Sequence, residues 1–167
     1  MRKIVIGIMG PGYGALDTDQ KNAYTLGTLI AQEGWVLLTG GRNVGVMDAA
    51  SRGAKAANGL TVGILPTDDD QAVSQAVDIA IMTGMGSARN TINVLSSDVV
   101  IACGMGTGTA SEVALALKAN KPVVLLTDHQ ESLLFFESLA NGNIFLATSP
   151  EATIQFVKQV LSQVGRA

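Results

Sequence analysis

Two arginines and one glutamate lie in the glycine-rich stretches of this chain. Arg42 lies in TGGRNVG (residues 39–45), Arg89 lies in TGMGSARN (83–90), and Glu112 ends GMGTGTASE (104–112). Arginine forms charge-assisted hydrogen bonds with phosphate, and glycine lets an anion approach the backbone N–H groups at a helix start. A glutamate at such a site can act on a ribosyl centre or a water molecule, or it can only fix the loop. The residue types therefore indicate a pocket for a phosphorylated small molecule, with or without chemistry at Glu112.

A fourth glycine-rich stretch, GPGYG (residues 10–14), follows the first apolar run. In GMGTGTASE we expect the backbone N–H groups and the Thr107 and Thr109 hydroxyls to bind the phosphate. Tyr13 could stack on a flat ring of the ligand or pack against the protein. The predicted cofactor-binding positions are Gly10, Gly12, Tyr13, Gly40, Gly41, Arg42, Gly84, Arg89, Gly104, Met105, Gly106, Thr107, Gly108, Thr109 and Glu112.

Two common phosphate sites do not match these stretches. A P-loop requires GxxxxGK[ST], and no lysine follows the glycines of GMGTGTAS, so ATP hydrolysis is not expected. A dinucleotide site requires GxGxxG after the first strand and an acidic residue at the end of the second. Here the first stretch is GPGYGA, and the second strand ends in Thr-Gly-Gly (residues 39–41). The sequence therefore disfavours NAD binding.

The glycine-rich stretches each follow an apolar run and lead into a helical pattern, which indicates strand–loop–helix units. Runs that are apolar throughout are typical of parallel strands covered on both faces, whereas apolar residues at helical spacing indicate amphipathic helices. We therefore predict an α/β fold: one three-layer, doubly wound (Rossmann-like) domain over residues 1–167, with a mainly parallel sheet of six to seven strands and helices on both faces. The predicted strands are 3–9, 35–40, 60–65, 78–83, 98–104, 122–127 and a short 144–147; the predicted helices are 19–33, 46–57, 88–95, 109–119 and 150–164, the last capped by Ser149.

Composition narrows the function further. The net charge is −3, so the chain lacks the basic footprint of a nucleic-acid-binding protein. With one cysteine (Cys103) and one histidine (His129), neither a cysteine cluster nor a multi-histidine metal site is expected, and we predict no metal site. No apolar run is long enough to span a bilayer, so we expect no membrane partner and a cytoplasmic protein. The three aspartates at residues 68–70 are interpreted as a solvated loop that caps a helix, and His129 as a surface residue without an evident partner.

Two motifs carry a family resemblance. TGGRNVGVMDAASRGA (residues 39–54) and ARNTINVLSSDVVIACGMGTGTASEVALALKANKPVVLL (88–126) resemble the family once labelled "lysine decarboxylase-like", which includes the Lonely Guy phosphoribohydrolases and the molybdenum cofactor carrier proteins. The resemblance covers nearly the whole chain. It implies a homodimer or a tetramer, and molybdoenzymes or cofactor-synthesis proteins as further partners.

The resemblance leaves two main functions open. The hydrolases carry PGGxGTxxE preceded by an Arg-Lys pair; this chain keeps Arg89, Gly108-Thr109 and Glu112 but has Asn90 for the lysine and Gly-Met-Gly (residues 104–106) for Pro-Gly-Gly. The short chain and the forms TGMGSARN (residues 83–90) and KPVVLL (121–126) resemble the carrier branch, which implies that the pocket holds the phosphate and pterin of the molybdenum cofactor without turnover. The alternative is a nucleoside 5′-monophosphate phosphoribohydrolase, in which Arg89 holds phosphate and Glu112 is catalytic. A nucleotide-sensing module is a third, weaker hypothesis.

Two sulfur-containing residues near the third motif have two possible roles. Cys103 and Met105 flank Gly104, and sulfur is a suitable ligand for soft metals, so a contact with molybdenum is conceivable. The alternative is that Cys103 is a small buried hydrophobic residue at the end of a strand.

Overall fold

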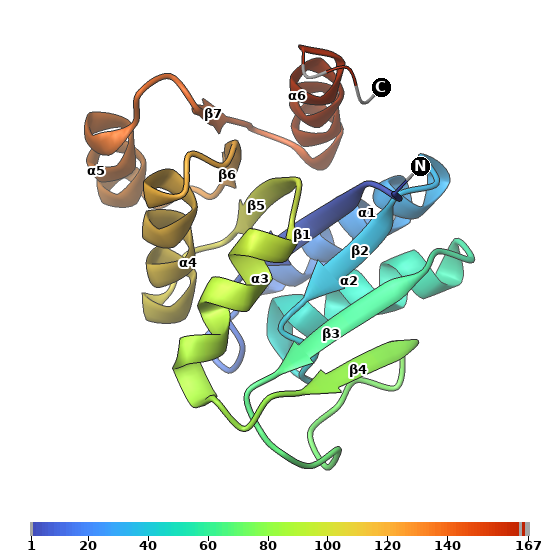
Figure 1. Cartoon of the computed structure of the whole chain (residues 1–167). Helices are drawn as coiled ribbons and strands as arrows, with labels where there is room; N and C mark the ends of the chain where they lie inside the picture. Colours follow the sequence, from blue (N-terminus) through green and yellow to red (C-terminus); the bar gives the residue numbers. More distant parts are fainter. Residues whose placement is uncertain (1, 164, 166–167) are drawn as a thin grey trace.

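The strands form one sheet of seven, and every pairing in it is parallel. The computed structural model describes residues 2–163 and 165. The strand order is β4-β3-β2-β1-β5-β6-β7, so the chain winds outward in one direction from β1 and then in the other from β5 (Figure 1). The strands are β1 (Val5–Met9), β2 (Val36–Thr39), β3 (Thr61–Leu65), β4 (Ile79–Met82), β5 (Val99–Cys103), β6 (Val123–Leu126) and β7 (Ile144–Leu146). This confirms the predicted α/β Rossmann-like architecture.

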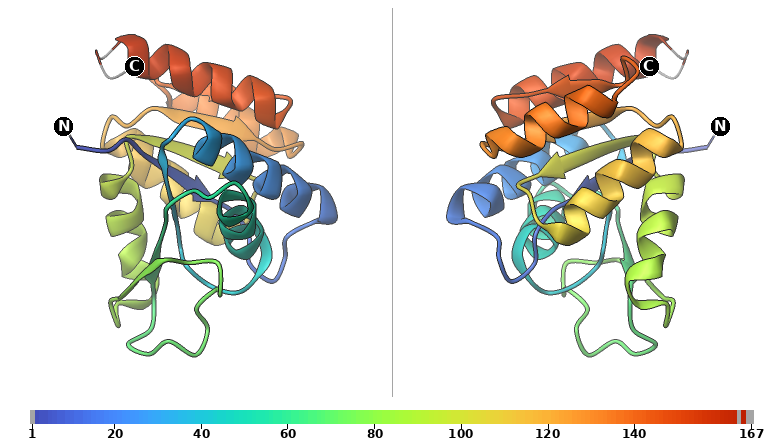
Figure 2. Two further views of the ribbon diagram at one scale, coloured as in Figure 1. Left: turned by 90° about the vertical axis from the view of Figure 1, so that its right-hand side faces the viewer. Right: turned by 90° about the vertical axis from the view of Figure 1, so that its left-hand side faces the viewer.

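Helices cover both faces of the sheet, and each face has its own apolar core. One core contains buried residues of α1, α2 and α6, and the other contains buried residues of α3, α4 and α5. Figure 2 shows the strands between these two groups of helices. The helices are α1 (Asp17–Gln32), α2 (Gly45–Ala56), the short 3₁₀ helix η1 (Gly86–Arg89), α3 (Asn90–Ser96), α4 (Thr107–Lys118), α5 (Gln130–Leu139) and α6 (Pro150–Gln163).

The central strands are apolar because both of their faces are covered. All five residues of β5 are fully buried, since β5 lies between β1 and β6 under helices of both layers. Parallel strands of this kind place all their carboxyl ends at one edge of the sheet. The order reverses between β1 and β5, so the loops after these two strands diverge and leave a crevice, which is where ligands bind in open α/β sheets.

Several local expectations need correction. Helix α5 was not predicted, and His129 is not without a partner: its Nδ1 accepts a hydrogen bond from the Ser132 N–H at 3.3 Å and caps this helix. The aspartates at residues 68–70 lie in an exposed loop as expected, but turns rather than a helix follow them. In contrast, Ser149 caps α6 as predicted, with its Oγ accepting from the Ala152 N–H at 3.1 Å. Val164, in the predicted last helix, lies outside the described residues.

Strand β4 departs from the expected coverage on both faces. The connection from β3 to β4 (residues 66–78) contains no helix, so the sheet lacks a covering element there (Figure 1). Ile79, Ile81 and Met82 are consequently 48%, 45% and 43% exposed. This edge of the molecule is therefore an uncovered apolar surface.

In the part of the chain that the structure describes, no helix is both long enough and apolar enough to cross a bilayer.

Candidate phosphate pocket

A pocket of about 430 Å³ lies at the carboxyl ends of β1, β2 and β5, in the crevice where the strand order reverses. This volume is within the range of small-molecule sites. Eleven of the fifteen predicted positions line it: Gly10, Gly12, Gly40, Arg42, Arg89, Met105, Gly106, Thr107, Gly108, Thr109 and Glu112. The fold thus brings together four stretches that are far apart in the sequence.

The start of α4 forms one wall of the pocket. Gly106 is the extended residue before the helix, and the first intrahelical hydrogen bond runs from the Ala110 N–H to the Gly106 carbonyl at 2.8 Å. No side chain caps this helix, and the first N–H groups of a helix have no partner within it. These donors and the positive end of the helix dipole make the wall suitable for an anion.

Two features of this first turn fit a phosphate group. A Cβ added to Gly108 would meet no protein atom within 4 Å, so folding does not require a glycine here. The Thr109 side chain is only 2% exposed, and its hydroxyl oxygen has no hydrogen-bond partner. A buried hydroxyl without a partner is costly, and a ligand oxygen at this wall would remove the cost.

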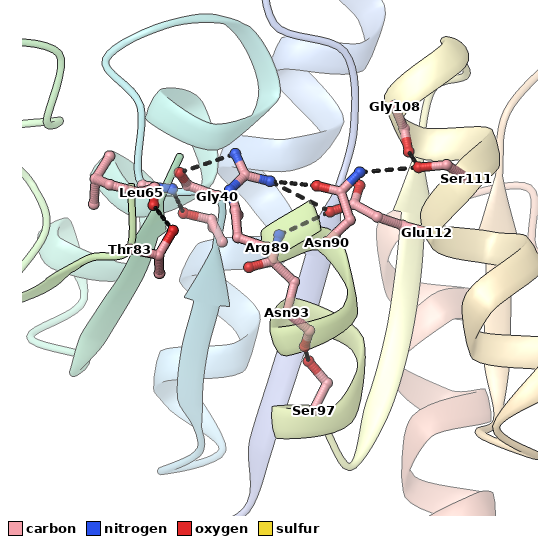
Figure 3. A network of polar contacts seen from close by, with 12 residues as sticks. Gly40, Leu65, Thr83, Arg89, Asn90, Asn93, Ser97, Gly108, Ser111 and Glu112 are labelled. Carbon is pink, nitrogen blue, oxygen red and sulfur yellow. Dashed lines mark hydrogen bonds and ion pairs between the residues drawn. The ribbon is translucent and has the colours of Figure 1, made fainter. Parts of the chain in front are cut away.

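Arg89 approaches the same wall from η1. Its side chain is tied to α4 by a chain of hydrogen bonds: Nη1 donates to Asn90 Oδ1 at 2.6 Å, and Asn90 Nδ2 donates to Ser111 Oγ at 2.9 Å (Figure 3). Ser111 Oγ in turn donates to the Gly108 carbonyl at 2.7 Å. Asn90, which stands where the hydrolases have lysine, therefore fixes the position of Arg89 relative to the helix start.

The Arg89 guanidinium still has unused hydrogen-bonding capacity. Nη2 lies 3.5 Å from the Gly40 carbonyl, which is a weak contact, and buried Nε has no partner. A Cβ on Gly40 would lie 2.7 Å from Nη2, so the glycine makes room for the guanidinium. Burial is the main reason why the pKa of Arg89 is lowered from its ordinary value. An anion in the pocket would satisfy both the charge and the free donor.

Glu112 lies in the second turn of α4, so it does not cap the helix or sit next to its N-terminus. Its side chain turns toward α3, where Asn93 Nδ2 donates to Glu112 Oε1 at 2.8 Å, and Arg89 Nη1 lies 3.8 Å from the same oxygen (Figure 3). The residue is 6% exposed. Burial raises the pKa of Glu112 to about 7, against the opposing effects of Asn93 and Arg89.

Arg42 lines the pocket from the loop after β2. Its guanidinium carbon lies 5.2 Å from the centre of the Tyr13 ring, a cation–π distance. Tyr13 itself is 85% exposed and does not line the pocket. Tyr13 therefore stands beside the pocket, with one face of its ring against Arg42.

Three predicted glycines also lie outside the pocket lining, and packing accounts for two of them. Gly104 has φ of 73°, and a Cβ there would meet the Asp19 carboxylate at 2.5 Å. Gly41 has φ of 75° and backs onto Gly63 of β3, and Gly84 has φ of 64° in the turn after β4. A positive φ is the conformation that glycine adopts most easily.

Cys103 is a buried hydrophobic residue rather than a pocket residue. It is fully buried in the core beneath α1, α2 and α6, and its Sγ donates to the Asp19 carbonyl at 3.4 Å. Burial raises the pKa of the Cys103 thiol to about 12. Met105, in contrast, does line the pocket. Over residues 2–163 and 165, no three His, Cys, Asp or Glu side chains are arranged to hold a metal ion.

Asn93 is a functional candidate that the sequence analysis missed. It is fully buried, bonds Glu112, and its Oδ1 has no hydrogen-bond partner. The signal that could have revealed it is its spacing: Asn93 follows Arg89 by four residues, so both lie on one face of the helical segment. A polar residue at that spacing within an apolar pattern suggests a buried hydrogen bond.

Comparisons with known proteins agree with this geometry. Residues 3–154 match the model of the SLOG cluster4 family. The structure superposes with a TM-score of 0.95 on the molybdenum cofactor binding protein of the phototrophic bacterium Rippkaea orientalis, at 64% identity, covering 96% of this chain and 99% of that one. The Moco carrier protein of Chlamydomonas reinhardtii gives 0.91 at 52% identity, with 97% and 99% covered.

A protein of unknown function from Archaeoglobus fulgidus is 47% identical over 126 residues, which are 75% of this chain and 82% of that protein. The family match extends over both motifs that carry the resemblance to the Lonely Guy class, and over the four loops that form the pocket. The chain belongs to the SLOG cluster4 family.

Proposed function

We propose that this protein is a carrier that binds the molybdenum cofactor in the pocket at the start of α4, and that it stores and protects the cofactor without turning it over. The observation that carries the proposal is the uncapped start of α4 beside Arg89, with the unpartnered Thr109 hydroxyl in the first turn of the same helix. This arrangement suits the phosphate end of the cofactor. The solved structures named above, which are 52–64% identical over nearly the whole chain, support molybdenum cofactor as the ligand.

The proposed contacts follow from the lining. The N–H groups of the first turn of α4, the Thr109 hydroxyl and the Arg89 guanidinium hold the phosphate, and Arg42 supplies charge from the other side. Met105 lies at the edge of this wall and faces the pocket. We expect Tyr13 to lie against the flat pterin ring, since its ring is exposed beside Arg42.

The phosphoribohydrolase alternative is not favoured. In this chain Asn90 replaces the lysine of the hydrolase motif, and Asn90 is used to hold Arg89. The decisive experiment is to incubate the protein with AMP and with cytokinin monophosphates and to measure free base, and in parallel to measure binding of the molybdenum cofactor. We expect cofactor binding and no base release. Base release that disappears in Glu112→Ala would overturn the carrier function.

Self-association is the second part of the proposal. Strand β4 exposes Ile79 and Ile81 on one face and Met82 on the other, and exposed Met85 follows it in the chain. Exposed apolar patches of this kind are typical of protein–protein contacts. We expect a second copy of the chain to cover this edge strand in a dimer or tetramer. We expect molybdoenzymes or cofactor-synthesis proteins to be the other partners. We expect the cytoplasm to be the compartment. Light scattering on wild type and on Ile81→Glu tests the contact: the variant should be smaller, and an unchanged mass would exclude this edge strand.

A further inference from the structure

The charged residues of the pocket do not balance one another. Three charged side chains line it: Arg42, Arg89 and Glu112. With Glu112 ionised, their sum is +1; with Glu112 protonated, it is +2. A ligand group with two negative charges is therefore matched only when Glu112 carries a proton.

The contact between Glu112 and Arg89 is electrostatic only. Arg89 Nη1 lies 3.8 Å from Glu112 Oε1, which is beyond hydrogen-bond distance, and Nη1 donates to Asn90 instead. An ionised Glu112 thus offsets the charge of Arg89 without using its donors. Protonation leaves the position of Arg89 fixed, through Asn90, and makes its full charge available to an anion.

The surroundings of Glu112 accommodate the neutral form. Its side chain is 6% exposed, and Asn93 is its hydrogen-bond partner. An amide carries both donors and an acceptor, so Asn93 can bond a carboxylate or a carboxylic acid. Burial places the pKa of Glu112 near 7, so both forms are populated at neutral pH before any ligand binds.

The elements packed against α4 add few other titratable groups. Helix α3 (NTINVLS) and strand β6 (VVLL) carry none, and β5 carries only Cys103, which faces the opposite core. Helix α5 carries Glu131 and Glu137, both exposed. The charged group that bears directly on Glu112 is therefore Arg89 from η1, and Arg42 from the loop after β2 acts on Arg89.

We propose that binding of a dianionic group in this pocket is coupled to the uptake of one proton from solvent by Glu112, so that the protein holds its ligand more tightly at lower pH. The coupling rests on the proposed function, because it requires the anion site at the start of α4. The reason is electrostatic: a carboxylate in the same buried pocket repels the incoming anion, and the proton removes this repulsion. By linkage, the affinity for the anion falls as the pH rises through the pKa of Glu112 in the ligand-free protein.

The test uses inorganic sulfate, which keeps its two negative charges across the neutral range, so that any pH dependence belongs to the protein. Binding is measured by isothermal titration calorimetry at about pH 6, 7 and 8, in buffers of different ionisation enthalpy. For wild type we expect the affinity to fall about tenfold from pH 6 to pH 8, with uptake approaching one proton at pH 8. Glu112→Gln, which mimics the protonated form, should bind at all three pH values as tightly as wild type does at pH 6.

The control is Glu33→Gln, because Glu33 pairs with Lys158 at 2.7 Å and does not line the pocket. This variant should keep the pH dependence of wild type. Sulfate binding by wild type that is independent of pH and takes up no proton overturns the coupling but leaves the proposed function intact. Absence of sulfate binding at every pH overturns both. The number of protons that wild type takes up on binding sulfate tests the coupling even if Glu112→Gln does not fold.

Discussion

Replacing Arg89 with methionine separates its role in binding from its role in the fold. Methionine keeps most of the apolar stem and removes the charge and all the donors. Arg89 has a free Nε and only a weak contact at Nη2, so the ligand has at least one strong donor to gain there. A charge-assisted hydrogen bond typically contributes about 1.5–3 kcal/mol. We therefore expect Arg89→Met to weaken phosphate or cofactor binding by roughly ten- to a hundredfold.

The effect on stability should depend on pH. At 3.8 Å and an effective dielectric constant of about 20, the attraction between Arg89 and Glu112 is roughly 4 kcal/mol, before the desolvation cost of the two charges is subtracted. Without Arg89, the pKa of Glu112 rises further, because the attraction to this arginine is one of the effects that lower it. Near pH 6 the Glu112 carboxyl is then neutral, so Arg89→Met should lower the free energy of unfolding only slightly. At pH 8 it should lower the free energy of unfolding more.

The assays are calorimetric titration with phosphate and denaturant unfolding at both pH values. The double variant Arg89→Met/Glu112→Gln should recover stability at pH 8 but not affinity. The matched control is Arg52→Met, since Arg52 is an exposed arginine that pairs with Asp48 at 2.9 Å and does not line the pocket. Phosphate affinity that is unchanged in a folded Arg89→Met protein, or lost equally in Arg52→Met, would refute the role assigned to Arg89.

Three further predictions follow from the same geometry. Gly108→Ala should raise the melting temperature, because alanine stabilises a helix by up to about 1 kcal/mol over glycine. It should also weaken phosphate binding roughly tenfold, because the new methyl group would lie where the ligand approaches. Unchanged binding would mean that the phosphate does not contact this turn. Cys103→Ala should leave cofactor binding within about twofold, and the native thiol should resist alkylating reagents, since it is buried and its pKa is about 12; rapid labelling would contradict its position. Glu112→Gln should make the free energy of unfolding less dependent on pH. Burial raises the carboxyl pKa from 4.5 to about 7, so this group favours the folded state of wild type most below pH 4.5, and that contribution is lost as the pH rises to 7. The variant should therefore be more stable than wild type at pH 8, by at most about 3 kcal/mol. Equal unfolding free energies of the two proteins at pH 8 would contradict the buried position of Glu112.

The sheet and the pocket loops could be predicted for a physical reason. A strand covered on both faces must be apolar throughout, as β5 is, and this signal survives in a single sequence. Parallel pairing then places the loops after β1, β2 and β5 at one edge, whatever the details of packing. The predicted bounds of the strands therefore agree with the structure within two residues at every end.

Helix α5 could not be predicted with the same ease because most of it is exposed. Its sequence, QESLLFFESL, has four consecutive apolar residues, and only Phe136 of the helix is buried. A run without one apolar face gives no clear helical period. Its cap, His129, is also not one of the residues that usually cap helices.

The sequence also does not show why each glycine is present. Gly40, Gly104 and Gly108 look alike in their stretches, yet a side chain at Gly40 would displace Arg89, one at Gly104 would meet Asp19, and one at Gly108 would meet no protein atom. Only the folded neighbours distinguish a glycine that packing requires from one that a ligand would require. The predicted start of α4 at Thr109 was similarly two residues late, since Gly106 and Gly108 weaken the helical pattern at a start that has no side-chain cap.

The position of Glu112 argues for binding rather than hydrolysis. Cleavage of a glycosidic bond usually employs two carboxyl groups, one of which stays ionised beside a centre that becomes positive. Among the described residues that line this pocket, Glu112 is the single carboxylate, burial holds its pKa near 7, and Arg89 stands 3.8 Å from it. Two arginines beside one half-protonated acid would repel a developing positive charge and attract a stable negative one. The electrostatics of the pocket therefore favour the binding of a stable anion over the stabilisation of a ribosyl cation.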